Sequence, residues 1–303
     1  MAVQFVTGTD AALFWQTVIL LQSFEEAEAC IPVKVCDFGL TPAQKGFLAE
    51  RDQLIPIPPL TGTLHHPWNY KTVLGSLVGP GTDAIVWLDA DMVVTRDPGP
   101  LVTEIVEAMK SLGQIVAACP DDCGYSLGSF LEIEGGKGRN VAPFKRNLEA
   151  HGVDLTPPYL NSGFLIATRD FRFDEWEKLT LGTEPHFLWD QSSLNVCAWS
   201  RPSTVRVLDK REWNVHGFAL GRARIDEDNL QVLCEDRIAT VLHATSPGAV
   251  YHDYIEAKWP LAGKEHAFRF KVFRNPGLGA IQLTFLNRFI HQNENNLAKW
   301  LNQ

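Results

Sequence analysis

The chain has 303 residues, of which 45% are hydrophobic and 21% charged, and its formal net charge is −9. This composition is ordinary for a globular protein with a sizeable core. The acidic balance argues against nucleic-acid binding, which needs a basic footprint. No apolar run approaches the ~20 residues of a membrane-spanning helix, and no basic segment precedes an apolar core at the N-terminus. We therefore expect a cytoplasmic protein, and its six scattered cysteines fit reduced thiols.

Residues 1–118 alternate short apolar runs with segments of helical periodicity. The predicted strands are Val3–Val6, Ile31–Cys36, Gln53–Ile57, Ala84–Leu88 and Gln114–Ala118. The predicted helices are Ala11–Phe24, Thr41–Arg51, Trp68–Leu77 and Leu101–Leu112, with Asp10 and Thr41 as N-caps. This alternation predicts an α/β fold with a mostly parallel sheet. The chain lacks Gly-x-Gly-x-x-Gly, which argues against a dinucleotide cofactor.

Two carboxylates, Asp89 and Asp91, follow directly on the apolar strand Ala84–Leu88. Residues two apart in an extended chain point to the same side. Like charges this close raise each other's pKa unless a cation neutralises them. Oxygen ligands suit a hard divalent ion such as Mg²⁺ or Mn²⁺, whose remaining positions substrate phosphates can fill. The alternative is that Asp89 caps a turn and Asp91 is solvated.

Residues 120–158 interrupt the alternation. The segment is rich in glycine and proline and has one helical patch, near Phe144–His151. Long irregular insertions in α/β domains are usually functional or mobile. We expect either a wall or lid of an acceptor site or a solvated excursion.

Beyond the insertion, Tyr159–Thr168 is a predicted strand with a polar entry. Its Asn161 offers an amide to a ligand hydroxyl, and Gly163 permits close backbone approach. Helices are predicted at Phe171–Leu179 and from Trp189 onward, the latter with Asp190 as N-cap, and strands at Val205–Leu208 and Ala239–His243.

Four segments, in this order, resemble motifs of one enzyme family. They are Trp87–Val94 with Asp-x-Asp, Tyr159–Ile166 with Asn-Ser-Gly, Asp190–Asn195 followed by Trp213-Asn214, and the strand that ends at His243. Together they make the chain similar to GT-A glycosyltransferases, and most similar to glycosyltransferase family 8, which contains bacterial lipooligosaccharide galactosyl- and glucosyltransferases and glycogenin. The resemblance covers roughly residues 3–248. It implies a single GT-A domain with a mixed central sheet flanked by helices, at residues 1–250.

The resemblance also implies roles for individual residues. Asp89, Asp91 and His243 would hold Mn²⁺ or Mg²⁺ on the diphosphate of a UDP-sugar. The donor-binding residues would be Thr7, Thr9, Asp10, Lys71, Asp89, Ala90, Asn161, Ser162 and Gly163. Asp190 and Gln191 would be the catalytic residues, in a retaining transfer by front-face displacement. UDP-glucose or UDP-galactose is the favoured donor, and the acceptor a glycan or lipid-linked molecule.

Several positions depart from the family pattern. Ala11-Ala12 replaces the usual aromatic residue after the first strand, and Ser246 stands at the usual glycine position. The nearest candidate for the diphosphate lysine is Lys258, and His252 is a rival to His243 as metal ligand.

Other functions remain open at this stage. An inverting GT-A enzyme needs a carboxylate base, which Asp121, Asp122 or Asp154 would supply. A non-catalytic protein that binds sugar nucleotides is a further alternative. A nucleotidyltransferase is a third, although Thr7–Asp10 lacks the basic loop residue it would show.

Residues 251–303 are predicted to form a C-terminal helical extension. From Lys258 onward this region carries seven Lys or Arg and two Glu, together with six Phe and Trp beyond Ala267. A basic, aromatic end on an acidic body fits peripheral contact with an anionic membrane. The alternative is that its aromatic side chains pack on the domain.

Overall fold

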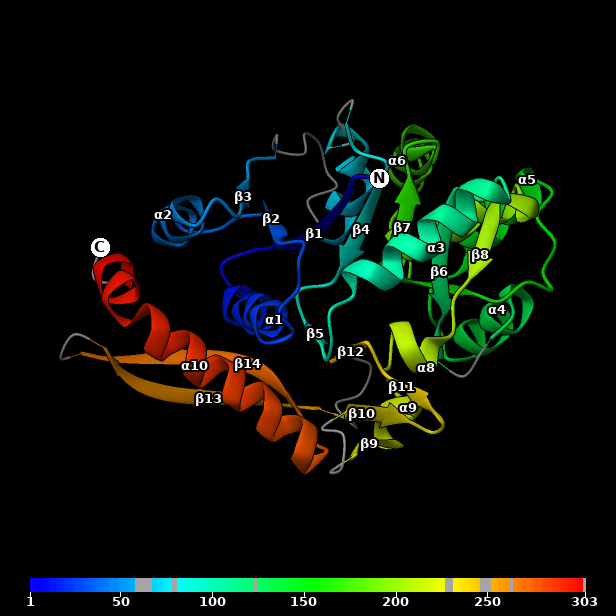
Figure 1. Ribbon diagram of the computed structural model, residues 1–303. Coiled ribbons are helices and arrows are strands. Elements are labelled where there is room, and N and C mark those ends of the chain that lie inside the picture. The colour runs from blue at the N-terminus through cyan, green and yellow to red at the C-terminus, as the bar shows by residue number, and fades with distance from the viewer. Residues whose placement is uncertain are drawn as a thin grey trace. The chain divides into compact units, whose positions relative to one another are not determined.

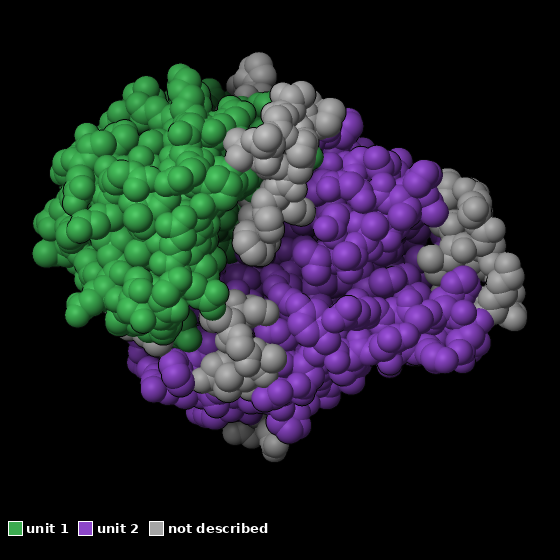
Figure 2. Space-filling model, turned by 180° about the vertical axis from the view of Figure 1, so that it is seen from behind, with its two compact units in different colours: residues 1–3, 59–87, 102–210 green, residues 4–58, 88–101, 211–303 purple. Residues whose placement is uncertain are grey.

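A computed structural model describes residues 1–57, 67–77, 81–122, 125–226, 231–245, 252–261 and 264–301. Ser246 and one of the six cysteines, Cys123, lie outside these residues. The predicted fold class is confirmed: the chain is α/β, with a central, mixed, mostly parallel sheet and flanking helices (Figure 1). Two compact units are distinguished in Figure 2. Unit 1 comprises Met1–Val3, Pro59–Trp87 and Val102–Lys210, and unit 2 comprises Gln4–Pro58, Leu88–Leu101 and Arg211–Gln303.

Unit 2 begins with parallel strands in the order β3-β2-β1. The elements are β1 (Val3–Thr9), α1 (Phe14–Glu26), β2 (Val33–Asp37), α2 (Pro42–Glu50) and β3 (Leu54–Ile55). The Thr41 cap is confirmed, because its hydroxyl accepts the Gln44 N–H and the Gln44 side chain returns the bond. The predicted Asp10 cap is wrong: α1 begins at Phe14 with Leu13 as N-cap, and the Asp10 carboxylate accepts the N–H groups of Ala12 and Leu13 in the turn ahead of it.

The Asp-x-Asp stretch is two strands and a turn. Strand β4 (Ala84–Leu88) ends before Asp89, and β5 (Met92–Val94) pairs antiparallel with β12 (Val241–His243). The N–H of Met92 donates to the Asp89 carbonyl, which closes the turn. Unit 2 also contains a small antiparallel sheet that was not predicted, formed by β9 (Ala223–Asp226), β10 (Gln231–Cys234) and β11 (Arg237–Ile238). The short helix α9 (Phe218–Gly221) precedes this sheet in the chain.

The C-terminal region corrects one prediction. Its helix α10 (Pro276–Leu301) is present, but a β-hairpin of β13 (His252–Leu261) and β14 (Lys264–Phe273) precedes it (Figure 1). Buried Phe268 and Phe270 alternate with exposed Arg269, and a period of two specifies a strand. The aromatic packing alternative is confirmed for four side chains that are buried, namely Phe268, Phe270, Phe273 and Phe289.

Unit 1 contains strands in the order β4-β7-β6-β8. Strand β7 (Leu160–Thr168), buried at every residue, runs antiparallel to β6 (Val116–Pro120), and β8 (Val205–Val207) runs parallel to β6. The remaining helices are η1 (Pro67–Leu77, a 3₁₀ helix), α3 (Gly99–Ser111), α6 (Phe173–Leu181), α7 (Trp189–Trp199), η3 (Pro202–Thr204) and α8 (Lys210–Trp213), of which α3 and α8 extend beyond unit 1.

The insertion at residues 120–158 is more regular than predicted. It forms two helices, α4 (Leu127–Gly136) and α5 (Ala142–Ala150). Helix α4 was missed because Gly128, Gly135 and Gly136 lower helix propensity. It forms nonetheless, because Ser126 caps its first turn and Phe130 stacks on Tyr159 with ring centroids 3.7 Å apart.

No helix among the described residues is long and apolar enough to cross a bilayer. The five described cysteines are free thiols, of which Cys30 is exposed and the other four are buried. The proposed boundary between residues 1–250 and 251–303 stays a prediction.

Candidate functional site

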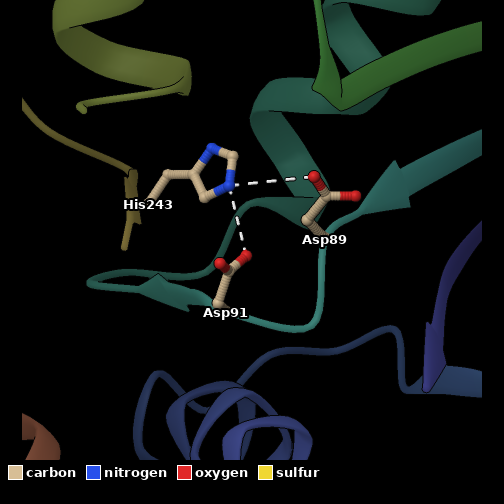
Figure 3. Close-up of side chains that lie close together, drawn as sticks. All are labelled: Asp89, Asp91 and His243. Carbon is tan, nitrogen blue, oxygen red and sulfur yellow. Dashed lines mark ion pairs between the residues drawn. The ribbon is translucent and has the colours of Figure 1, made fainter. Parts of the chain in front are cut away.

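Asp89, Asp91 and His243 converge in unit 2 (Figure 3). The Nε2 atom of His243 lies 3.2 Å from Asp91 Oδ1 and 3.7 Å from Asp89 Oδ2. One ligand atom from each residue lies within 4.8 Å of the other two. The side chain of His243 is 2% exposed, Asp91 13% and Asp89 26%, so the cluster is open on the side of the carboxylates.

Backbone pairing brings these residues together. In the β5–β12 ladder His243 is opposite Met92, one residue from Asp91. The Ala244 N–H also donates to the Asp91 carbonyl, at 3.0 Å. The ligand positions are therefore fixed by a strand pair and a closed turn, which holds them better than a free loop would.

A buried amide orients the histidine. Nδ1–H of His243 donates to Asn214 Oδ1 at 2.8 Å, and Asn214 is fully buried. With Nδ1 as the donor, the Nε2 lone pair faces the two carboxylates. Hydrogen bonding of the second ring nitrogen is the usual device that fixes a metal-binding histidine. The sequence analysis noted Trp213-Asn214 only as part of a motif and gave Asn214 no role.

A lysine that the sequence analysis missed reaches the same cluster. Lys271 on β14 places Nζ 2.5 Å from Asp91 Oδ2, and it is buried. Burial raises the pKa of the Asp91 carboxyl, but the positive charge of Lys271 outweighs this and, with hydrogen bonding in the cluster, holds that pKa well below its usual range. Asp91 is therefore ionised at neutral pH.

The donor set fits a divalent metal ion. Two carboxylates and an imidazole with its lone pair turned inward can ligate one ion, and the remaining positions are free for water or phosphate oxygens. The rival His252 is buried and is not among the clustered ligands; burial, and then the charge of Lys271, lower its pKa. Lys258 pairs with Glu265 on the exposed hairpin surface, at 2.9 Å.

Unit 1 contains a second polar cluster, made by Lys71, Ser162 and Asp190. The Ser162 hydroxyl donates to Asp190 Oδ2 at 3.1 Å, and Lys71 Nζ donates to Ser162 Oγ at 3.1 Å. Lys71 Nζ also lies 3.5 Å from Asp190 Oδ2, with both side chains at most 7% exposed. The ammonium supplies the counter-charge that a buried carboxylate requires.

The cluster continues through amides. Gln191 Oε1 accepts the Ser162 N–H at 3.0 Å, and Gln191 Nε2 donates to Asp121 Oδ2 at 2.7 Å. Asn161 Nδ2 donates to Asp121 Oδ1 at 3.2 Å, and Asn161 Oδ1 accepts the Gly163 N–H. The structure thus brings together the predicted residues of β7 and α7, and adds Asp121, which sequence reasoning had assigned only to a rival mechanism.

The predicted N-cap role of Asp190 is wrong. Helix α7 begins at Trp189, and its N-cap is Leu188, which has a left-handed backbone. The Asp190 side chain turns to Ser162 and Lys71 instead. Asn195 then fixes α7 to β7 through paired bonds to the Leu160 backbone. The polar residues of α7 are therefore held by the helix–strand contact.

The remaining predicted donor residues lie in unit 2. Thr7 and Thr9 are buried in β1, where the Thr9 hydroxyl donates to the Asp10 carbonyl. Asp10 is half-buried at the end of this strand, and Ala90 is buried in the turn between Asp89 and Asp91. Their contact with a donor stays a prediction.

Comparison with known proteins supports the fold. No family model matches the sequence, and no curated protein matches it. The chain is similar in structure to the galactosyltransferase LgtC solved with donor and acceptor sugar analogues, with a TM-score of 0.58 and 16% identity over 94% of this chain and 95% of that one.

Two further structures are similar at the same level. The bifunctional glycosyltransferase WbbM in its apo form gives a TM-score of 0.56 at 15% identity, over 81% of this chain and 46% of that one. The glycosyltransferase GlyE of Streptococcus pneumoniae TIGR4 gives 0.55 at 16% identity, over 97% of this chain and 64% of that one. This chain thus spans about half the length of WbbM. At these identities the similarity establishes the fold, and it confirms the predicted GT-A architecture.

Proposed function

We propose that this chain is a metal-dependent glycosyltransferase that moves a hexose from a UDP-sugar to a glycan or lipid-linked acceptor. The observation that carries the proposal is the convergence of Asp89, Asp91 and His243 in a chain with the fold of several glycosyltransferases. Bound there, a divalent ion would neutralise the charge that develops on the departing nucleotide diphosphate. An imidazole beside two carboxylates favours Mn²⁺ over Mg²⁺.

The metal-centre residues have separate tasks in this proposal. Asp89 and Asp91 bind through carboxylate oxygens, and His243 binds through Nε2 while Asn214 holds the ring in place. Both ligand carboxylates lie on one short closed turn. Reorganisation on binding is therefore small, which favours pre-organised electrostatic stabilisation.

The unit 1 cluster is proposed to bind the transferred sugar. Asp190 offers carboxylate oxygens suited to sugar hydroxyls, and Lys71 is its buried cationic partner. Asn161, Ser162 and Gly163 line the same end of β7. Gln191 has both amide atoms engaged and is a poor nucleophile. These features favour a retaining front-face displacement over a covalent intermediate on Asp190.

The rival inverting mechanism needs a free carboxylate base. Asp121 accepts bonds from two side-chain amides, Asp122 pairs with Lys210 at 3.1 Å, and Asp154 accepts bonds from Thr156, two residues further along the chain. Each carboxylate already has a structural task, which favours the retaining proposal. The anomeric configuration of the product, read by NMR, decides between the two.

The donor is proposed to be UDP-glucose or UDP-galactose. The support is the similarity to LgtC, which is a galactosyltransferase and was solved with donor and acceptor analogues. Hexose choice depends on a few hydrogen bonds to individual hydroxyls. Competition between the two UDP-sugars at equal concentration tests this assignment.

The insertion at 120–158 is proposed to form the acceptor wall. Its two helices border a cavity of about 490 Å³, which is of the size that small ligands occupy. The lining surface is mostly apolar and includes three charged side chains; it comprises Gly128, Leu131, Glu132, Arg139, Asn140, Val141, Ala142, Lys145 and Leu155. A lipid-linked or aryl acceptor fits such a lining.

Membrane contact through the C-terminal region draws little support from its surface. Lys258 pairs with Glu265, Arg274 with Asp253, and Arg288 with Glu26. These pairs compensate part of the positive charge of this region within unit 2. A cytoplasmic location rests on the sequence alone, and co-sedimentation with anionic vesicles would test the membrane contact.

The test is release of UDP from UDP-glucose and UDP-galactose, with and without Mn²⁺, without an added acceptor. We expect metal-dependent release by the wild-type protein and loss in Asp91→Ala. Asp253→Asn, which removes an exposed carboxylate of the same unit, is the matched control and stays active. A wild-type protein that binds UDP-sugars and releases no UDP from any of them is the non-catalytic alternative.

A further inference from the structure

Asp91 uses its two oxygens for different partners. Oδ1 faces His243 Nε2 at 3.2 Å, on the side of the metal ligands, and Oδ2 faces Lys271 Nζ at 2.5 Å. The lysine belongs to a hairpin 180 residues away in sequence. A positive charge therefore touches one of the two carboxylates that are to hold a divalent cation.

The hairpin has other contacts that hold its place besides this ion pair. The backbone N–H of Lys271 donates to the side chain of Gln16 on α1, at 2.7 Å. Phe268 packs on Trp15 of the same helix, with ring centroids 3.9 Å apart, and α10 covers the hairpin through Gln282, which accepts the Phe273 N–H. Hydrogen bonds from the β14 backbone to two glutamine side chains, together with aromatic packing, thus dock β14. The effect of the Lys271 ammonium on Asp91 is separate from this docking.

We propose that Lys271 is a built-in counter-ion of the metal centre, which lowers the affinity of Asp89, Asp91 and His243 for a free divalent cation. The charge balance gives the direction. With Lys271 the two carboxylates and the ammonium sum to −1, and without it they sum to −2. A divalent ion is drawn more strongly to the second arrangement, and a unit positive charge beside its ligand repels it in the first.

Coulomb's law gives the size. Two unit charges about 4 Å apart change an equilibrium constant by a factor of ~5 even in bulk water, and a divalent ion doubles that energy. After solvent screening we expect removal of the ammonium to tighten metal binding on the order of tenfold. A purely structural brace predicts the opposite sign, because loss of a brace loosens the ligand set.

The Lys271 ammonium also fixes the binding mode. Because Oδ2 is held by Lys271, Asp91 would offer a metal ion Oδ1 alone. With the lysine in place, a bound ion would leave the cluster with a net charge of +1, which attracts an anionic diphosphate. The inference rests on the proposed metal site and is independent of sugar transfer.

The experiment is calorimetric titration of MnCl₂ into metal-free protein at neutral pH. The variants are Lys271→Met, which keeps the length and removes the charge, and Lys271→Arg, which keeps the charge. Lys258→Met on the exposed surface of the same hairpin is the matched control. Circular dichroism verifies that each variant is folded, and Lys271→Gln replaces Lys271→Met if the latter is unfolded.

The expected result is Mn²⁺ binding about tenfold tighter in Lys271→Met, and unchanged in Lys271→Arg and Lys258→Met. Equal or weaker binding in folded Lys271→Met overturns the inference, as does a gain in Lys271→Arg equal to that of Lys271→Met. No binding by any of the proteins also overturns it. A protein that binds Mn²⁺ as expected but releases no UDP keeps this inference and refutes the proposed function.

Discussion

The polar cluster of unit 1 and the metal-ligand cluster of unit 2 differ in how their carboxylates are neutralised. In unit 1 the Asp190 carboxylate is closed in by Ser162 and Lys71, whose donors point at one of its oxygens. In unit 2 one carboxylate oxygen each of Asp89 and Asp91 lies close to Nε2 of His243, and the cluster is open to solvent on the side of the carboxylates. The side chains of the first cluster are buried and are hydrogen-bonded to one another. The second is a set of ligands that a further cation completes, with Lys271 compensating part of its charge.

The difference teaches which residues respond to which ligand. A closed network presents fixed donors and acceptors, which suits recognition of sugar hydroxyls. An open set of anionic ligands responds to a metal ion. Substitutions in the two clusters are therefore expected to separate metal affinity from turnover.

The largest expected effect is the loss of turnover in Asp91→Asn and Asp190→Asn, and Mn²⁺ affinity distinguishes the two variants. We expect both to lower turnover of UDP-sugar by a factor on the order of 10² to 10³, because each removes an ionised group that acts in the transition state. Only Asp91→Asn is expected to weaken Mn²⁺ binding, measured by calorimetry. Equal Mn²⁺ affinities in the two variants would erase the distinction between the clusters.

Removing the counter-charge of the unit 1 cluster tests its closed character. In Lys71→Met the buried Asp190 loses its cation, and loss of one partner of a buried ion pair costs about 3–5 kcal/mol. Chemical denaturation of Lys71→Met measures the free energy of unfolding. Lys34→Met, at a pair in which Asp52 is fully exposed, is the control and changes it by less than about 1 kcal/mol. If both variants unfold alike, Lys71 is not the required counter-charge.

Asn214→Ala tests the support of the histidine. Loss of a hydrogen bond to a metal-binding imidazole weakens metal affinity by about 10- to 100-fold. We expect that loss in Mn²⁺ titrations, with secondary structure retained by circular dichroism. Unchanged affinity would show that His243 needs no fixed tautomer, or that it is not a ligand.

The smallest effect is expected from His252→Gln. His252 is buried but is not among the clustered ligands, so Mn²⁺ affinity should change by less than about twofold. A loss as large as that of His243→Gln would make His252 the third ligand.

The sequence predicted those parts of the site whose signal is local. Asp89 and Asp91 follow an apolar strand, which predicted a metal site from the residues themselves, whereas His243 was assigned as a ligand through the resemblance to glycosyltransferase family 8. Asn214 and Lys271 were not predicted, because their contacts join residues 29 and 180 positions apart and depend on how the β5–β12 ladder and the hairpin pack.

The fold shows the same division. The β/α alternation predicted the sheet class, since period and capping are local properties. Helix α4 was missed because three glycines mask a helix that Phe130 stabilises by packing on Tyr159. The hairpin was not predicted, although Phe268, Arg269 and Phe270 alternate as a strand does, because the alternation is short and basic side chains interrupt its apolar residues.

The most direct test of the metal centre is a crystal of this protein soaked with UDP and Mn²⁺, with anomalous diffraction recorded at the manganese edge. The account predicts one anomalous peak about 2.1 to 2.3 Å from Asp91 Oδ1, His243 Nε2 and one Asp89 oxygen, with diphosphate oxygens among the other ligands. Manganese bound at any other place, or liganded by His252 and not by His243, would contradict it.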